Sequence, residues 1–333
     1  MKHPLHKTAV LALAGLALTA CSTQEDSSAS GSTGGGGGDD LKIVMLLNDQ
    51  FDPYYLTLVK GAEEKAEELG IDFSWQAPTT LDVASQTQLL QSIAATKPDG
   101  IIMSALDADA MVAPMKQVQD SGIPIVTVDS DVNDESARLA TFKSDGKVNG
   151  EMAADEMAEL LGGEGKVGYV GYTPGIQSVD IRLDGWTEQL EEHEGLENEG
   201  EQYAGADIAE NAAKASALLS RVPDLAGIYA SWTNASIGAA NAVQQAGKSD
   251  DIVVIGVDAS PDEVALLEQG QIDALMVQKP YDMGKDAVEA LVEHARGGDE
   301  PESENLYDVV IATPENIDDP EISQYLYVKP ESE

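Results

Sequence analysis

Residues 41–70, LKIVMLLNDQFDPYYLTLVKGAEEKAEELG, decide how the rest of the chain is interpreted. The apolar run IVMLL has the length and composition of a buried strand, and it stops abruptly at Asn48. A proline and two aromatic residues, Tyr54 and Tyr55, then open a helical pattern. This strand–turn–helix unit places polar and aromatic side chains just beyond the end of a strand.

The same alternation of short apolar runs and helical patterns continues along the chain. Nearly continuous apolar strands separated by helices are typical of parallel sheets that helices cover on both faces. The folded part, residues 41–333, is long enough for two such units of about 150 residues each. We therefore expect an α/β fold with two parallel sheets. The expected strands are 42–47, 71–76, 99–104, 124–128, 138–142, 166–171, 226–230, 252–257 and 273–277.

The first 40 residues have a different character. Residues 1–20 combine a basic start with an apolar stretch too short to span a bilayer, as in a secretory signal peptide. The stretch LALTAC resembles a bacterial lipobox, which predicts lipidation of Cys21; an ordinary cleaved signal followed by a stray cysteine is the alternative. Residues 21–40 are rich in Ser and Gly and predict a flexible tether to a membrane anchor. Because Cys21 is the only cysteine, no disulfide forms within the chain.

The chain is strongly acidic, with 60 Asp and Glu against 19 Lys and Arg and a net charge of −41. Such a surface repels nucleic-acid phosphates, so we expect no nucleic-acid partner. The acidic residues are spread along the whole sequence, which favours an adaptation of solubility to salt or high pH. Attraction of cationic ligands is the alternative.

Polar and aromatic residues follow nearly every expected strand. In open parallel sheets, ligands bind outside the carboxyl ends of the strands, so these residues are the first candidates for a site. Asp129 and Asp258 occupy equivalent Val-Asp positions at the ends of two strands. Two carboxylates of this kind could perform acid–base chemistry on a glycosidic bond or accept hydrogen bonds from sugar hydroxyls. The second role requires only geometry and is the simpler interpretation.

Sequence motifs for other enzyme chemistry are absent. His193 and His294 have no partner at metal-ligand spacing, and the chain contains neither HExxH nor GxSxG. The stretch GGEGKVGYVG at 162–171 does not match a phosphate-binding loop and precedes a strand instead of following one. We therefore expect no enzyme activity, no metal and no cofactor.

Several longer stretches, in this order and spacing, resemble the type I periplasmic binding proteins of the ribose/galactose-binding branch. The stretches are residues 41–70 together with KPDGIIMSALDADA, GIPIVTVDSD, RLDGW, AGKSDDIVVIGVDASPDE, GQIDALMVQKPYDMG and VVIATPENID. The resemblance implies two Rossmann-like lobes joined by a three-strand hinge, with crossings near 143–146, 278–280 and 309–313. Lobe one would hold 41–143 plus 280–309, and lobe two would hold 144–279 plus 310–333.

The resemblance also implies a set of ligand-binding positions. These are Asn48, Asp52, Tyr54, Tyr55, Ser104, Asp129, Ser130, Asp180, Trp232, Asn234, Asp258 and Gln278. The sequence departs from the ribose type at several of them.

Ser130 and Asp180 stand where the ribose type has arginines, so arginine is expected to be absent from the site. Trp232 replaces an asparagine, with Asn234 as a possible substitute, and Asp52 also replaces an asparagine. The ligand is therefore expected to be a sugar or polyol other than ribose. An acidic, aromatic cleft without arginine would also suit an amine or other cation through ion pairing and cation–π contacts.

The implied role is the lipid-anchored, extracytoplasmic and monomeric substrate-binding component of an ABC importer, with the permease as its partner. Two alternatives stay open. The first is a ligand sensor for a membrane receptor. The second is a glycoside-processing enzyme, which would turn over a disaccharide, whereas a binding protein would show only saturable stabilisation by its ligand.

Overall fold

The computed structural model describes residues 41–328, so the predicted signal peptide, Cys21 and the tether lie outside the described residues. Two six-stranded sheets form the framework of this region. The first sheet is entirely parallel. In spatial order it consists of β11 (Glu304–Tyr307), β5 (Ala140–Ser144), β4 (Ile125–Val128), β3 (Gly100–Met103), β1 (Lys42–Leu46) and β2 (Asp72–Gln76).

The second sheet repeats this arrangement with one antiparallel strand at its edge. Strand β12 pairs with β10 in the antiparallel sense, and the remaining pairs are parallel. In spatial order the sheet consists of β12 (Val310–Ala312), β10 (Ala274–Val277), β9 (Val253–Val257), β8 (Leu225–Ala230), β6 (Gly165–Tyr172) and β7 (Leu196–Ala204). Two parallel sheets flanked by helices confirm the fold class expected from the alternation of apolar runs and helical patterns.

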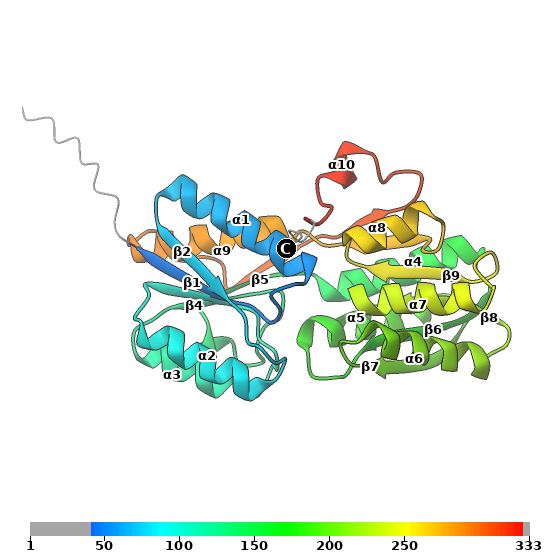
Figure 1. Cartoon of the computed structure of the whole chain (residues 1–333), viewed down its shortest axis with the longest axis horizontal. Helices are drawn as coiled ribbons and strands as arrows, with labels where there is room; N and C mark the ends of the chain where they lie inside the picture. The colour runs from blue at the N-terminus through cyan, green and yellow to red at the C-terminus, as the bar shows by residue number, and fades with distance from the viewer. Residues whose placement is uncertain (1–40, 329–333) are drawn as a thin grey trace, which may run out of the picture. The chain divides into compact units, whose positions relative to one another are not determined.

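Helices cover both faces of the first sheet, because successive side chains of a strand point to opposite faces. Ile43 and Met45 pack in the same apolar cluster as the helices α1 (Pro53–Leu69) and α9 (Pro280–Ala295). Val44 and Leu46 pack instead with α2 (Val83–Ala95) and α3 (Val112–Asp120). Figure 1 shows α1 and α9 on one side of this sheet and α2 and α3 on the other. Burial on both faces explains why β1 is continuously apolar.

The second sheet is covered in the same way. Its helices are α4 (Gly146–Leu161), α5 (Gln177–Leu190), α6 (Ile208–Arg221), α7 (Thr233–Gln245) and α8 (Pro261–Glu268), and two short helices, η1 (Glu135–Ala137) and α10 (Pro320–Ser323), lie elsewhere in the chain. Tyr169 and Tyr229 pack with α4 and α5, whereas Val170 and Ile228 pack with α6 and α7 on the opposite face. None of the helices in the described region combines the length and apolar character needed to cross a bilayer.

Three strands were not predicted, namely β7, β11 and β12, and all three lie at the edge of a sheet. Strand β7, with the sequence LENEGEQYA, is mostly exposed or partly exposed. An edge strand has a neighbour on one side only and needs little apolar surface, so no apolar run marks β7 in the sequence. The chain leaves the first sheet after Ser144, returns to it after Val277 and leaves it again after Tyr307.

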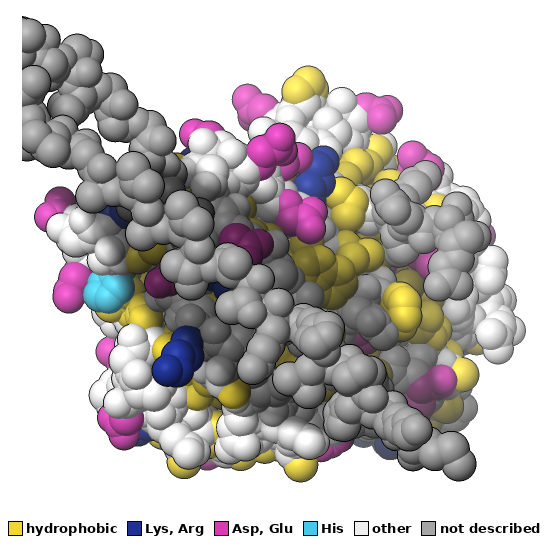
Figure 2. Space-filling model, turned by 60° about the vertical axis from the view of Figure 1, so that its left-hand side comes forward, with side chains coloured by type: hydrophobic (Ala, Val, Ile, Leu, Met, Phe, Trp, Pro, Cys, Tyr) yellow, Lys and Arg dark blue, Asp and Glu magenta, His cyan; other side chains and the backbone are white. Residues whose placement is uncertain are grey.

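Acidic side chains are dispersed over the one face of the described region that Figure 2 shows. On the face shown in Figure 2, Asp and Glu side chains occupy many separate places, and few Lys or Arg side chains are visible. The charge is therefore not concentrated in one acidic patch on this face.

Candidate ligand-binding cleft

A cavity of about 290 Å³ lies where the carboxyl ends of the strands of both sheets meet. Nine of the twelve residues predicted from the sequence line it. They are Asn48, Asp52, Tyr54, Tyr55, Asp129, Trp232, Asn234, Asp258 and Gln278. These nine residues come from segments that are distant along the chain, and they are nine of the 21 residues that line the cavity.

Asp129 and Asp258 occupy equivalent places at the ends of β4 and β9. Both have a positive φ, 62° for Asp129 and 93° for Asp258, in a region that residues with a side chain rarely adopt. The backbone N–H of each donates to a carbonyl of the neighbouring strand, Phe142 for the first and Met276 for the second. This conformation is unfavourable for most residues, and both halves of the cleft share it at the end of a strand.

The two carboxylates differ in how many of their oxygen positions the protein already uses. In Asp129, Oδ2 accepts hydrogen bonds from Tyr55 Oη at 2.9 Å, Ser104 Oγ at 3.1 Å and Ser130 Oγ at 3.4 Å, whereas Oδ1 accepts none from residues 41–328. In Asp258, Oδ1 accepts from Gln278 Nε2 at 2.7 Å and from Tyr327 Oη at 2.9 Å. The backbone N–H and hydroxyl of Thr233 donate to its Oδ2 at 3.2 and 2.9 Å.

A carboxylate offers about four acceptor positions, so the protein itself fills those of Asp258. Asp129 keeps an oxygen available for a ligand. Burial raises the pKa of Asp129, and the charge of Arg182 acts in the opposite direction. The two equivalent aspartates therefore have different roles: Asp129 can accept a hydrogen bond from a ligand, and Asp258 organises the surrounding protein groups.

A buried hydrogen-bond chain that sequence reasoning missed holds Asp129 in place. Gln86, on α2, donates to Asn48 Oδ1 at 2.7 Å and to the carbonyl of Ser104 at 2.8 Å. Asn48 in turn donates to Tyr55 Oη at 3.0 Å and to Ser104 Oγ at 3.1 Å. Asn48 and Ser104 thus orient the Tyr55 hydroxyl toward Asp129. Gln86 lies inside a helix and not at the end of a strand, so its position in the sequence does not mark it as a site residue.

The two tyrosines after Pro53 are more buried than a stacking surface would require. Tyr54 and Tyr55 are 5% and 9% exposed, and their rings meet edge to face with centroids 5.3 Å apart. The Tyr54 hydroxyl donates to Met283 Sδ at 3.5 Å. Trp232 is less buried and packs edge to face against Tyr172 at 5.2 Å, and both line the cavity. Trp232 therefore offers the larger aromatic surface to a ligand.

Three predicted residues, Ser104, Ser130 and Asp180, do not line the cavity. Ser104 supports Asp129, as described above. The Ser130 hydroxyl forms a 2.8 Å hydrogen bond with that of Ser178, which connects the end of β4 with α5. Asp180 accepts a hydrogen bond from the backbone N–H of Gly175 at 2.9 Å and so closes the loop before α5.

The expectation that arginine is absent from the cleft is wrong. Arg182 is 3% exposed, lines the cavity, and donates to the Ser231 carbonyl and to Gln278 Oε1, both at 2.9 Å. Burial lowers its pKa, but Asp258 and Asp129 among other nearby groups outweigh this effect and raise it overall. Positions 180 and 182 differ by about 200° around a helix, so they face opposite sides. The motif RLDGW begins with Arg182, and this was the signal that could have identified it.

Asp52 is the N-cap of α1 and also lines the cavity. Its Oδ1 accepts a hydrogen bond from the backbone N–H of Tyr54 at 2.9 Å. Burial, followed by the charge of Asp258, raises the pKa of Asp52 from 3.8 to about 7. Between pH 3.8 and about pH 7 the folded state therefore binds more protons than the unfolded state, so the free energy of unfolding falls as the pH rises through this range.

Asp52→Asn removes this titration. The change that it causes in the free energy of unfolding is therefore expected to be more favourable at pH 8 than at pH 4, by an amount on the order of 2 kcal/mol. Asparagine is an equally good N-cap, so the helix start is preserved. Urea unfolding of both chains at the two pH values measures this difference.

Asp82, the N-cap of α2, provides a matched control. Hydrogen bonds, first from Thr80, lower the pKa of Asp82 to about 2, so it titrates below this range. Asp82→Asn should change stability equally at both pH values. The assignment for Asp52 is contradicted if Asp52→Asn behaves in the same way as this control.

The fold and the cleft define a class of two-lobed α/β binding proteins, and comparison with known proteins identifies the family. A family model described as a periplasmic binding protein domain matches residues 43–299. The chain belongs to this periplasmic binding protein family.

Its relatives include the D-allose-binding periplasmic protein of Escherichia coli, which is 26% identical over 76% of this chain and 84% of the relative. A putative rhizopine-binding protein of Rhizobium meliloti is 30% identical over 74% of this chain and 82% of the relative. A solute-binding protein of Agrobacterium vitis, solved with bound α-D-tagatopyranose, superimposes with a TM-score of 0.84. It is 29% identical and aligns over 87% of this chain and all of the other. The first two relatives are named as binding proteins, and the third is a solute-binding protein of an ABC transporter. The chain, as a member of this family, is a binding protein and not an enzyme.

Proposed function

We propose that the chain captures a small sugar or polyol in the cleft and delivers it to the permease of an ABC importer. The observation that carries the proposal is Oδ1 of Asp129, which accepts no hydrogen bond from residues 41–328 and lies in a small cavity that Arg182, Gln278 and the partly exposed Trp232 also line. A carboxylate oxygen and a guanidinium bind hydroxyl groups by charge-assisted hydrogen bonds, and an aromatic surface packs against the C–H face of a sugar ring. Relatives named for allose, ribose and tagatose binding support the same ligand class.

The alternative of a cationic ligand is weakened by Arg182. That alternative was based on an acidic cleft without arginine, whereas the buried guanidinium of Arg182 lines the same cavity as Asp129 and Asp258. An ammonium group in this cavity would meet a fixed positive charge as well as the carboxylates. A neutral polyhydroxyl compound can pair with both kinds of group.

We further propose that Cys21 carries a lipid and holds the binding protein at the outer face of the membrane. The lipobox-like stretch LALTAC and the Ser- and Gly-rich residues 22–40 support this placement. A tethered binding protein stays within reach of its permease, which increases their effective concentration.

A thermal-shift screen tests the ligand class. D-allose, D-ribose, D-tagatose, D-fucose, myo-inositol and putrescine are each added to the purified chain with Cys21→Ser. A sugar or polyol present at about 100 times its dissociation constant should stabilise the folded state by about 2.7 kcal/mol. At least one of the sugars or myo-inositol should raise the melting temperature and putrescine should not. A rise in the melting temperature with putrescine alone would contradict a sugar ligand and indicate a cationic one.

A further inference from the structure

The segment that follows β12 covers residues 313–328 of the described chain, and its last residues reach Asp258. Tyr327 is 5% exposed, and its backbone N–H donates to the carbonyl of Ala259 at 3.1 Å. Its hydroxyl donates to Asp258 Oδ1 at 2.9 Å. A residue near the end of the described chain therefore fills one of the acceptor positions of a cleft carboxylate.

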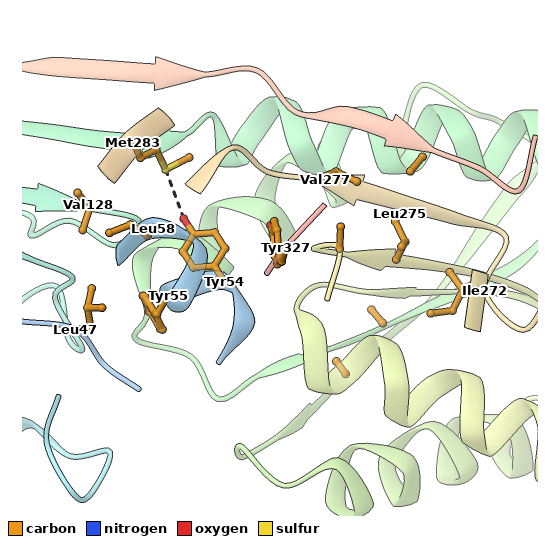
Figure 3. Packing of buried hydrophobic residues seen from close by; sticks show 14 of the residues in the cluster. Leu47, Tyr54, Tyr55, Leu58, Val128, Ile272, Leu275, Val277, Met283 and Tyr327 are labelled. Atoms are coloured by element: carbon orange, nitrogen blue, oxygen red, sulfur yellow. Dashed lines mark hydrogen bonds between the residues drawn. The ribbon is translucent and has the colours of Figure 1, made fainter. Parts of the chain in front are cut away.

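Tyr327 and the next residue, Val328, also contact α1, the first helix of the first lobe. The ring of Tyr327 meets the ring of Tyr54 edge to face, with centroids 5.7 Å apart and an interplanar angle of 74°. The backbone N–H of Val328 donates to Thr57 Oγ1 at 2.9 Å. In Figure 3, Tyr327 lies between the Tyr54 and Leu58 side of the cluster and the Leu275 and Ile272 side.

The part of the segment before Tyr327 is fixed to the second sheet. Asn316 accepts a hydrogen bond from the backbone N–H of Thr313 at 2.8 Å and donates to the carbonyl of Ile311 on β12 at 3.0 Å. Ile317 is buried, and the ammonium group of Lys279 lies 4.9 Å from the centroid of the Tyr325 ring. Because one part is fixed to the second lobe, the contacts of Tyr327 and Val328 with α1 must break if the lobes separate.

We propose that residues 313–328, the C-terminal segment, contribute to ligand binding in two ways. Tyr327 positions Asp258, and Tyr327 and Val328 together hold the two lobes in contact. Asp258 acts on a ligand through Gln278, which donates to Asp258 Oδ1 and lines the cavity. This effect on a ligand rests on the proposed function, whereas the connection between the lobes does not. A closed arrangement that is more populated before binding raises the apparent affinity, because affinity scales with the fraction of competent molecules. Of the contacts of Tyr327, only the ring contact with Tyr54 joins the lobes, and its loss corresponds to roughly a 2- to 12-fold change in such an equilibrium.

Distances between the lobes test the connection without any ligand. Spin labels are attached to Gln117→Cys on α3 and Gln244→Cys on α7, two exposed positions, in the full chain carrying Cys21→Ser. Tyr327→Ala should increase the population at longer inter-label distances roughly 2- to 12-fold. Thr57→Val removes the acceptor for Val328, together with the hydroxyl's own hydrogen bond to the Pro53 carbonyl within the first turn of α1, and should change this population in the same direction. Tyr281→Phe, which removes an exposed tyrosine–carboxylate hydrogen bond to Glu64, should leave the distances unchanged.

Unchanged distances in both Tyr327→Ala and Thr57→Val would overturn the proposal. A folded Thr57→Val chain keeps the test decisive if Tyr327→Ala does not fold.

Tyr327→Phe tests the positioning of Asp258, with D-allose as the probe in isothermal titration. The ring is retained, so the distances should remain those of the unmodified chain while the dissociation constant rises roughly 10-fold. An unchanged dissociation constant would show that Tyr327 does not position Asp258. If D-allose fails to bind the unmodified chain, that result counts against the proposed ligand, and the distance measurement still decides the proposal about the segment.

Discussion

Replacing Asp129 with asparagine is expected to weaken binding of the best-binding sugar about 100-fold while leaving the chain folded. The amide can still accept from Tyr55 and Ser104 through its oxygen, but its NH₂ group replaces the free oxygen Oδ1 and cannot accept from a ligand hydroxyl. Hydrogen bonds to charged groups contribute about 1.5–3 kcal/mol, and the substitution leaves a hydroxyl donor of the ligand without this acceptor. Isothermal titration of the sugar that stabilises the unmodified chain most measures the change.

Asp207→Asn is the matched control for this substitution. Asp207 is the N-cap of α6, outside the cavity that Asp129 lines, and asparagine keeps the capping hydrogen bond to Glu210. Its dissociation constant should equal that of the unmodified chain. If Asp129→Asn binds the sugar as tightly as the control does, Asp129 is not the ligand acceptor and the assignment of roles to the two aspartates is wrong.

Replacing Arg138 with methionine is expected to lower the free energy of unfolding by about 3–5 kcal/mol. The side chains of Arg138 and Asp131 are 2% and 3% exposed, and the guanidinium donates to both carboxylate oxygens at 2.8–3.0 Å. Arg138 also donates to the carbonyl of Ser303 at 2.7 Å, so the pair fastens the stretch before β11 to the sheet. Removing the arginine leaves a buried carboxylate whose remaining cation, Lys143, is 4.0 Å away. Urea unfolding followed by circular dichroism measures the loss.

Two comparisons distinguish an unpaired buried charge from a loss of packing. Solvent screens the exposed pair of Lys147 and Glu188, so Glu188→Gln should have only a small effect on stability. Combining Arg138→Met with Asp131→Leu removes both charges and should recover a large part of the lost stability. A double substitution as unstable as Arg138→Met alone would mean that packing, and not the unpaired charge, causes the effect.

The sequence predicted the central strands well and the edge strands poorly, for a physical reason. Strand β1 is buried on both faces and therefore apolar at every position, so its sequence identifies it without its neighbours. Strand β7 is held in the sheet by backbone hydrogen bonds to β6, and any residue except proline can form such bonds. Its acidic sequence carries no signal of this pairing.

For the cleft, the sequence by itself determined which residue types lie at the ends of the strands, because the chain order of strands and helices fixes that edge. Tertiary structure alone decided which of these groups remain available to a ligand. Asp129 and Asp258 look alike in sequence, yet the donors that fill Asp258 come from Thr233, Gln278 and Tyr327, which lie 20–69 residues away along the chain. Whether an oxygen is occupied depends on contacts at this range, and local sequence patterns do not encode them.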